Sequence, residues 1–128
     1  METLILTPRI TEVNYGNHIS NLAIMAWLED ARADISQLLN HEVNGEKFGS
    51  VIVRIDCQFK SEVFYGSAVE IKTNIAVIGN SSLTINQKAF QKGILAAEST
   101  TIIVYFNSDK KCATTIPDNV RKLLKDYT

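Results

Sequence analysis

The side chains best suited to chemistry gather in one polar stretch near the start of the chain, residues 12–21 (EVNYGNHISN). His18 can accept and release a proton near neutral pH, and Glu12 places a carboxylate six residues before it. Asn14 can hydrogen-bond a carbonyl or a water, but an amide cannot take up a proton. The stretch therefore offers one potential base beside a carboxylate and several amides, where the chain turns towards a helix.

A long helix is expected over residues 18–40. Residues 22–28 are all apolar, so we expect the first half of the helix to be enclosed by protein. Apolar residues then recur at spacings of three and four as far as Leu39, which predicts an amphipathic second half. Asn17 is the expected N-cap. Unpaired backbone amides at residues 18–20 would then point out of the first turn, where the helix dipole favours negative charge.

The rest of the chain has the period of β-strands. Alternation of apolar and polar residues predicts long strands over 51–59, 69–77, 83–91 and 94–106, separated by turn sequences that contain glycine. A short strand precedes Pro8, and a short terminal helix is expected to begin at Pro117. One helix followed by an antiparallel meander predicts an α+β fold, with the helix lying on a curved sheet.

Composition excludes several classes of function. The 128 residues suit one domain, and 13 basic against 14 acidic residues do not suggest a dedicated surface for nucleic acid. No apolar run reaches membrane-spanning length and no secretory leader is evident, so a cytoplasmic protein outside the membrane is expected. Cys57 and Cys112 lack metal-ligand spacing, so neither a metal nor a disulfide is predicted. Cys57 falls on an apolar phase and is expected in the core.

The predicted sheet has more apolar surface than one helix can cover. Several apolar residues fall on strand phases opposite to their apolar neighbours: Ile52, Ile94, Ile102, Val104 and Phe106. Exposing them would leave a large apolar patch. We therefore expect a second copy of the chain to cover it, in a homodimer or a dimer of dimers.

The order of these elements resembles the hot-dog-fold acyl-CoA thioesterases, the superfamily of 4-hydroxybenzoyl-CoA thioesterase. The matching positions before the helix are Glu12, Asn14, His18, Ile19 and Asn21, and those within it are Trp27, Leu28, Glu29, Ala31 and Arg32. Residues 64–71 resemble the family's turn into the next strand, and residues 115–117 precede the last helix as in that family. The resemblance extends over nearly the whole chain.

The resemblance implies a hot-dog fold over residues 1–128 that hydrolyses an acyl thioester to free acid and CoA between two subunits. It implies no cofactor apart from the CoA of the substrate, and it makes acyl-CoA the expected partner. Asn14 and His18 take the catalytic positions. The substrate-binding positions implied are Tyr15, Gly16, Asn17, Ile19 and Asn21.

The chain departs from the family at one important position. Members usually have an aspartate where this chain has Asn14, and that aspartate acts as nucleophile or base. His18 is then the best remaining base, with Glu12 as a group that orients it. Glu29 is a reserve base, although its default role is an ion pair with Arg32 on the polar helix side. A non-catalytic binder of acyl thioesters is the alternative, and a hydratase is weaker because no carboxylate evidently pairs with the histidine.

Overall fold

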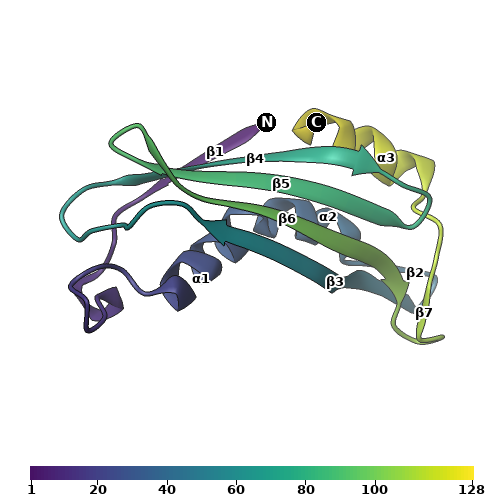
Figure 1. Ribbon diagram of the computed structural model, residues 1–128. Helices are drawn as coiled ribbons and strands as arrows, with labels where there is room; N and C mark the ends of the chain where they lie inside the picture. Colours follow the sequence, from purple (N-terminus) through teal and green to yellow (C-terminus); the bar gives the residue numbers. More distant parts are fainter.

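A computed structural model describes residues 1–128 and shows a curved antiparallel sheet with two helices along its concave side (Figure 1). The α+β class expected from the sequence is confirmed. The strands are β1 (Glu2–Leu6), β2 (His41–Val43), β3 (Glu46–Phe59), β4 (Val69–Ile78), β5 (Ser82–Gln91), β6 (Ile94–Asn107) and β7 (Cys112–Ala113). The helices are α1 (Asn21–Ala31), α2 (Ala33–Leu39) and α3 (Asp118–Leu124), with 3-10 turns η1 (Ile10–Glu12) and η2 (Lys125–Tyr127). The strand order is β1-β4-β5-β6-β3-β2, and β7 pairs with β6.

The expected long helix is present as two helices. Arg32 lies between α1 and α2 with φ −104° and ψ 7°, which interrupts the helical path. The N-cap is Ser20, whose Oγ accepts a hydrogen bond from the amide of Leu22 at 3.2 Å. Asn17 has φ 60°, in the left-handed region, so it cannot begin an α-helix. The prediction of Asn17 as the cap was therefore wrong, and the expected helix start was three residues too early.

α1 buries only one of its sides in the chain. Ile24, Trp27 and Leu28 are buried in a cluster with apolar residues of β4, β5 and β6. On the other side, the Leu22 side chain is 75% exposed. The single chain therefore encloses only one side of the first half of the helix, and the enclosure expected from residues 22–28 would need a second copy of the chain to be complete.

β3 is an open edge of the sheet along most of its length. β2 pairs with it only at residues 46–48, so residues 49–59 have β6 on one side and no strand on the other. A bulge at Val53 shifts the register, and this side chain is 59% exposed. Ile55 and Phe59 pair with buried residues of β6, so they belong to the face that carries the helix, yet both are exposed.

The outer face of the sheet is partly apolar near the C-terminal end of β6. Ile102, Val104 and Phe106 are half-buried and alternate with the fully buried Ile103 and Tyr105, as the strand period predicts. Ile52 was expected on this outer face. It lies opposite Ile103 on the inner face instead, because Val51 is the residue whose phase matches Val104.

The chain contains neither a helix suited to cross a membrane nor a cluster of side chains suited to bind a metal. No helix combines the length and the apolar character needed to cross a bilayer. No cluster of three or more His, Cys, Asp or Glu side chains is arranged to hold a metal ion. Cys57 is half-buried on the inner phase of β3, where burial raises the pKa of its thiol, and Cys112 is exposed.

Candidate active site

Glu12 ties the polar loop to α1. Its Oε1 accepts a hydrogen bond from the backbone N–H of Arg9 at 2.7 Å, and its Oε2 accepts one from Trp27 Nε1 at 2.9 Å. Its carbonyl oxygen also accepts from the amide of Ser20 at 2.8 Å. Both carboxylate oxygens are therefore engaged in holding the loop. The expectation that Glu12 orients His18 was wrong, because the carboxylate faces the helix side chain instead.

Asn14 folds the loop back on itself. Its Oδ1 accepts from the amide of Gly16 at 3.0 Å, an Asx turn, while its own amide donates to the carbonyl of His18 at 2.9 Å. The amide of Asn17 completes the turn by donating to the Asn14 carbonyl at 3.2 Å. The side-chain nitrogen of Asn14 has no acceptor in the chain, so it is a free donor next to His18.

The imidazole of His18 has a defined orientation. Its Nδ1 lies 3.3 Å from the carbonyl oxygen of Ile19. Because a carbonyl can only accept, Nδ1 carries the proton in the neutral ring and Nε2 has the free lone pair. Gly16 packs close to Nε2 and Cδ2 of the ring, where an added Cβ would come within 2.8 Å of Nε2 and 2.9 Å of Cδ2. No carboxylate is hydrogen-bonded to either ring nitrogen.

Backbone amides before α1 are only partly available for an oxyanion. The amide of Ile19 donates to the Val63 carbonyl at 2.7 Å and that of Ser20 to the Glu12 carbonyl, so these two expected donors are used within the chain. The amides of His18 and Asn21 have no acceptor in the chain. Asn21 is the first residue of α1, where the helix dipole adds partial positive charge. Of residues 18–21, His18 and Asn21 therefore have free amides, rather than the three consecutive residues that were expected.

These groups open onto a cleft of about 380 Å³. One wall comes from the loop and the start of α1, namely Asn14, His18, Ile19, Asn21 and Ile24. The facing wall is residues 59–63, where the chain leaves β3. Apolar side chains of Ile24, Phe59 and Val63 line it together with polar groups, which is the usual composition of a small-molecule site.

The expected site residues divide into two groups. Asn14, His18, Ile19 and Asn21 line the cleft, whereas Tyr15, Gly16 and Asn17 do not. The Tyr15 side chain is fully exposed on the loop, Asn17 is also exposed, and Gly16 lies behind the histidine ring. Residues 60–62 (Lys60, Ser61, Glu62) form part of the wall, and Ser61 and Glu62 were not predicted at the site. Their only sequence signal was position, directly after the cleanest strand pattern.

Glu29 and Arg32 do not form the ion pair expected from their spacing. Arg32 is 4% exposed and donates from a guanidinium nitrogen to Gln87 Oε1 at 3.3 Å. Gln87 in turn donates to the Leu28 carbonyl at 2.8 Å and to Thr73 Oγ1 at 3.1 Å. Burial lowers the pKa of Arg32, and the charge of Glu29 acts in the opposite direction. Arg32 is buried at the break between the two helices, while Glu29 is exposed and lies outside the cleft.

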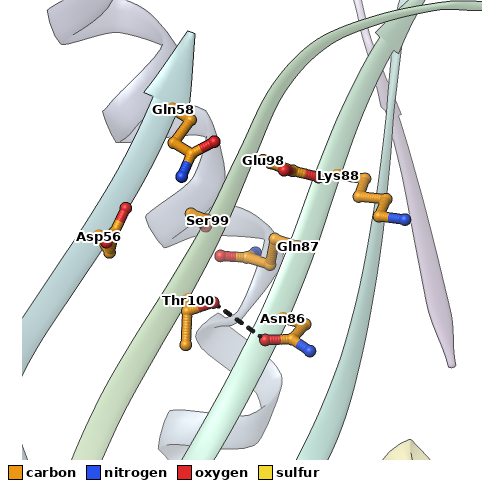
Figure 2. Close-up of a pocket in the computed structure, with 8 residues that line it drawn as sticks. All are labelled: Asp56, Gln58, Asn86, Gln87, Lys88, Glu98, Ser99 and Thr100. Carbon is orange, nitrogen blue, oxygen red and sulfur yellow. Dashed lines mark hydrogen bonds between the residues drawn. The ribbon is translucent and has the colours of Figure 1, made fainter. Parts of the chain in front are cut away.

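A second hollow, of about 250 Å³, lies over the middle of the sheet (Figure 2). Its lining is entirely polar and includes Asp56, Lys88, Glu98 and the hydrogen-bonded pair Thr100 and Asn86, whose Oγ1 and Oδ1 are 3.2 Å apart. It contains none of the residues singled out in the sequence and no apolar wall for a hydrocarbon chain. The cleft at the start of α1 is therefore the better candidate.

Comparisons with known proteins identify the family and the fold of the chain. A sequence model described as the thioesterase-like superfamily matches residues 8–124. A predicted thioesterase from Bacillus stearothermophilus is 31% identical, with a TM-score of 0.89, over 98% of this chain and 95% of that one. A hypothetical protein from Thermus thermophilus is 20% identical, with a TM-score of 0.85 over the full length of both chains. A search of curated proteins found no match.

Another similar structure is a thioesterase, also from Thermus thermophilus, complexed with coenzyme A and Zn. It is 18% identical, with a TM-score of 0.82, and 96% of each chain is covered. At this identity the likeness supports the fold.

A curved antiparallel sheet around a helix, with a cleft at the start of that helix, defines a protein of the hot-dog thioesterase class. The match over residues 8–124 and the relative at 31% identity show that this chain belongs to the thioesterase-like superfamily. Thioester hydrolysis is accordingly the general chemistry that the family supports.

Proposed function

We propose that this protein is an acyl-CoA thioesterase whose reaction takes place in the cleft between residues 14–24 and 59–63. The main support for the proposal is that one cleft contains both free backbone N–H donors and an apolar wall. The amides of His18 and Asn21 lack acceptors, and Ile24, Phe59 and Val63 lie in the same cleft. An acyl chain can lie along that wall while its thioester carbonyl approaches the amides.

Hydrolysis needs a site for the negative charge that develops on the carbonyl oxygen. Preorganised N–H donors meet this need, and one such donor is worth about 3 kcal/mol of transition-state stabilisation, or roughly a hundredfold in rate. The amides of His18 and Asn21, with the dipole of α1 behind them, are the donors we assign. The free side-chain nitrogen of Asn14 can hydrogen-bond the substrate carbonyl or the attacking water.

His18 is the residue that we expect to hold the attacking water. Its Nε2 lone pair is available, because Nδ1 is committed to the Ile19 carbonyl. This nitrogen can accept a hydrogen bond from the attacking water. We therefore expect His18→Ala to lower hydrolysis strongly, and Asn14→Asp to preserve or raise it, since an aspartate retains the acceptor for the Gly16 amide and adds a base.

The open edge of β3 supports a site shared between two copies of the chain. Residues 49–59 have unpaired backbone groups on one side, and Val53, Ile55 and Phe59 are exposed along it. Unpaired edges with exposed apolar side chains are suited to pairing with another strand. Phe59 also lines the cleft, so a partner on this edge would complete the cleft wall. The exposed side of α1 at Leu22 is a further surface for the partner to cover.

The direct test is release of free thiol from a panel of acyl-CoAs that differ in chain length and in aromatic content. Saturable release by the wild-type protein, lost in His18→Ala, supports the proposal. The replacement of the usual aspartate by Asn14 favours one competing function, a non-catalytic binder of acyl thioesters. Saturable binding of acyl-CoA with no thiol release by any preparation would establish that alternative instead.

A further inference from the structure

Glu62 is the only carboxylate among the residues that line the cleft. We propose that Glu62 is the general base that takes the proton from the attacking water. The proposal rests on the thioesterase function proposed above and assigns the step that Asn14 cannot perform. General-base catalysis requires a proton acceptor near the water, and an amide side chain is not one.

The other candidate carboxylates are either engaged in hydrogen bonds or lie outside the cleft. Both carboxylate oxygens of Glu12 accept hydrogen bonds within the chain, from Arg9 and Trp27. Glu29 lies outside the cleft. The carboxylate of Glu62 is exposed and forms no hydrogen bond or ion pair with the chain, so both oxygens are free to accept. The Glu62 carboxylate therefore has no structural role in this chain.

The segment that carries Glu62 is firmly held on both sides. Before it, the amides of Lys60 and Ser61 donate to the Ala96 carbonyl at 2.7 and 3.2 Å, and Ser61 Oγ donates to the Leu95 carbonyl at 2.7 Å. After it, the side chain of Gln91 clamps Phe64. A catalytic group needs such a support, because a displacement of about 1 Å can cost a hundredfold in rate.

Gln91 makes this clamp with both ends of its amide. Its Oε1 accepts from the amide of Phe64 at 2.9 Å, while its Nε2 donates to the carbonyls of Phe64 and Ser67 at 2.7 and 3.0 Å. Gln91 is itself buried. Between the clamp and Glu62, the Val63 carbonyl accepts from the amide of Ile19 at 2.7 Å. That bond joins the segment of Glu62 to the residue that follows His18, so the two walls of the cleft are fixed relative to each other.

The His18 ring lacks the partner that would stabilise it as a proton acceptor. No carboxylate is hydrogen-bonded to either ring nitrogen to stabilise an imidazolium. Glu62 has both carboxylate oxygens free in the same cleft, so we assign the proton to Glu62. His18 then positions the water through Nε2 and does not keep its proton.

The step balances with water as the only co-reactant. Glu62 removes one proton from water as the water oxygen forms a bond to the thioester carbon, and the carbonyl oxygen becomes an oxyanion held by the amides. When the oxyanion collapses, the C–S bond breaks and its electron pair leaves on sulfur. The proton held by Glu62 passes to that sulfur, which gives a thiol and a carboxylic acid and restores the Glu62 carboxylate.

The test compares thiol release by the wild type with that of Glu62→Gln, Glu62→Ala, and the double variant Glu62→Gln/Asn14→Asp, with CoA thioesters across pH 5 to 9. A CoA thioether, which cannot be hydrolysed, measures binding separately. Glu42→Gln, an exposed glutamate on β2 at the far end of the sheet, is the matched control. We expect Glu62→Gln to lower kcat by about 100-fold or more while thioether affinity stays unchanged.

Three further results are expected from the same set. Glu42→Gln keeps wild-type kcat, and added acetate restores turnover to Glu62→Ala. The Asn14→Asp change restores part of the kcat of Glu62→Gln, because it returns a carboxylate to the opposite wall.

Wild-type kcat in Glu62→Gln, or a parallel loss of thioether affinity, overturns the assignment while leaving thioesterase function intact. An equal loss of kcat in Glu42→Gln also overturns it. A wild-type protein that releases no thiol from any thioester overturns the proposed function, and the base with it.

Discussion

The His18 ring lies directly against Gly16, where a methyl group in place of a hydrogen would come within 2.8 Å of Nε2 and 2.9 Å of Cδ2. The contact therefore holds the His18 imidazole, which carries the free lone pair on Nε2, against the polar loop. Position 16 therefore requires glycine because the His18 ring lies so close to it. Its backbone angles impose no such requirement, since other residues can adopt them. This explains why a residue outside the cleft lining still bears on the chemistry within it.

Gly16→Ala should displace the His18 ring and reduce kcat by roughly 10- to 100-fold, the range expected when a reacting group moves by about 1 Å. The imidazole is the end of a flexible side chain, so it can yield without unfolding the loop. Steady-state kinetics together with a thermal melt measure both effects. Full activity with an unchanged Tm would show that the His18 position does not matter for turnover.

Trp27→Phe should destabilise the fold by about 1.5 to 3 kcal/mol, because it leaves the partly buried Glu12 carboxylate without its indole donor. The ring that packs in the core is largely retained, so lost packing contributes less. Urea unfolding with Cm and m read together measures the change. Ile10→Ala, an exposed residue on the same loop, serves as the control and should leave Cm unchanged. An unaltered Cm in Trp27→Phe would mean that the bond contributes little.

A carboxyl pair joins the N-terminal strand to α2. Burial and the neighbouring carboxyl of Asp34 raise the pKa of Glu2, and burial with the charges of both carboxyls raises the pKa of Tyr127 close by. A carboxyl group with a raised folded pKa binds its proton more tightly in the folded state. It therefore adds stability at low pH that is lost as pH rises through the folded pKa.

Glu2→Gln should accordingly make the protein more stable than the wild type at neutral pH, by less than about 1 kcal/mol because the group is partly exposed. The difference should shrink as pH falls and the wild-type carboxyl takes up its proton. Thermal melts of both proteins between pH 4 and 8 test the sign. A gain that grows on acidification would contradict the assignment of Asp34 as the cause.

Val53→Asp should convert the proposed dimer to a monomer, because it places a charge at the bulge of the open β3 edge. The side chain is exposed in the single chain, so the fold itself should persist. Light scattering at micromolar concentration gives the mass, and circular dichroism checks the fold. A wild-type protein that is already monomeric would refute the shared cleft.

Much of the architecture could be predicted from the sequence, because a buried face requires apolar residues at the period of a helix or a strand. Alternation over residues 51–59 and 94–106 placed two long strands, and the apolar run at 22–28 placed the helix, since each pattern extends over many neighbouring residues. The helix start was misplaced because Asn17 and Ser20 are both suitable caps, and the left-handed backbone at Asn17 was not visible in its side-chain type.

The site was only half predictable. Asn14, His18 and Asn21 were found from their order along the chain, but Glu62 carries no signal beyond its place after a strand. Glu12 and Arg32 were assigned partners at the nearest suitable spacing, whereas their observed partners, Trp27 and Gln87, come from α1 and β5. Nearby residues are easy candidates, yet side-chain direction decides which contact forms.

By itself, the sequence determined the fold class, the positions of the long strands, and the polar stretch that feeds the helix, because all three depend on residue order within one segment. Only the tertiary structure decided that residues 14–21 face residues 59–63 across a cleft, with the bond from Ile19 to Val63 between them. That meeting depends on the register of β3 against β6 and on where the chain leaves the sheet. Such long-range distances are set by the packing of the whole chain, and no local pattern encodes them.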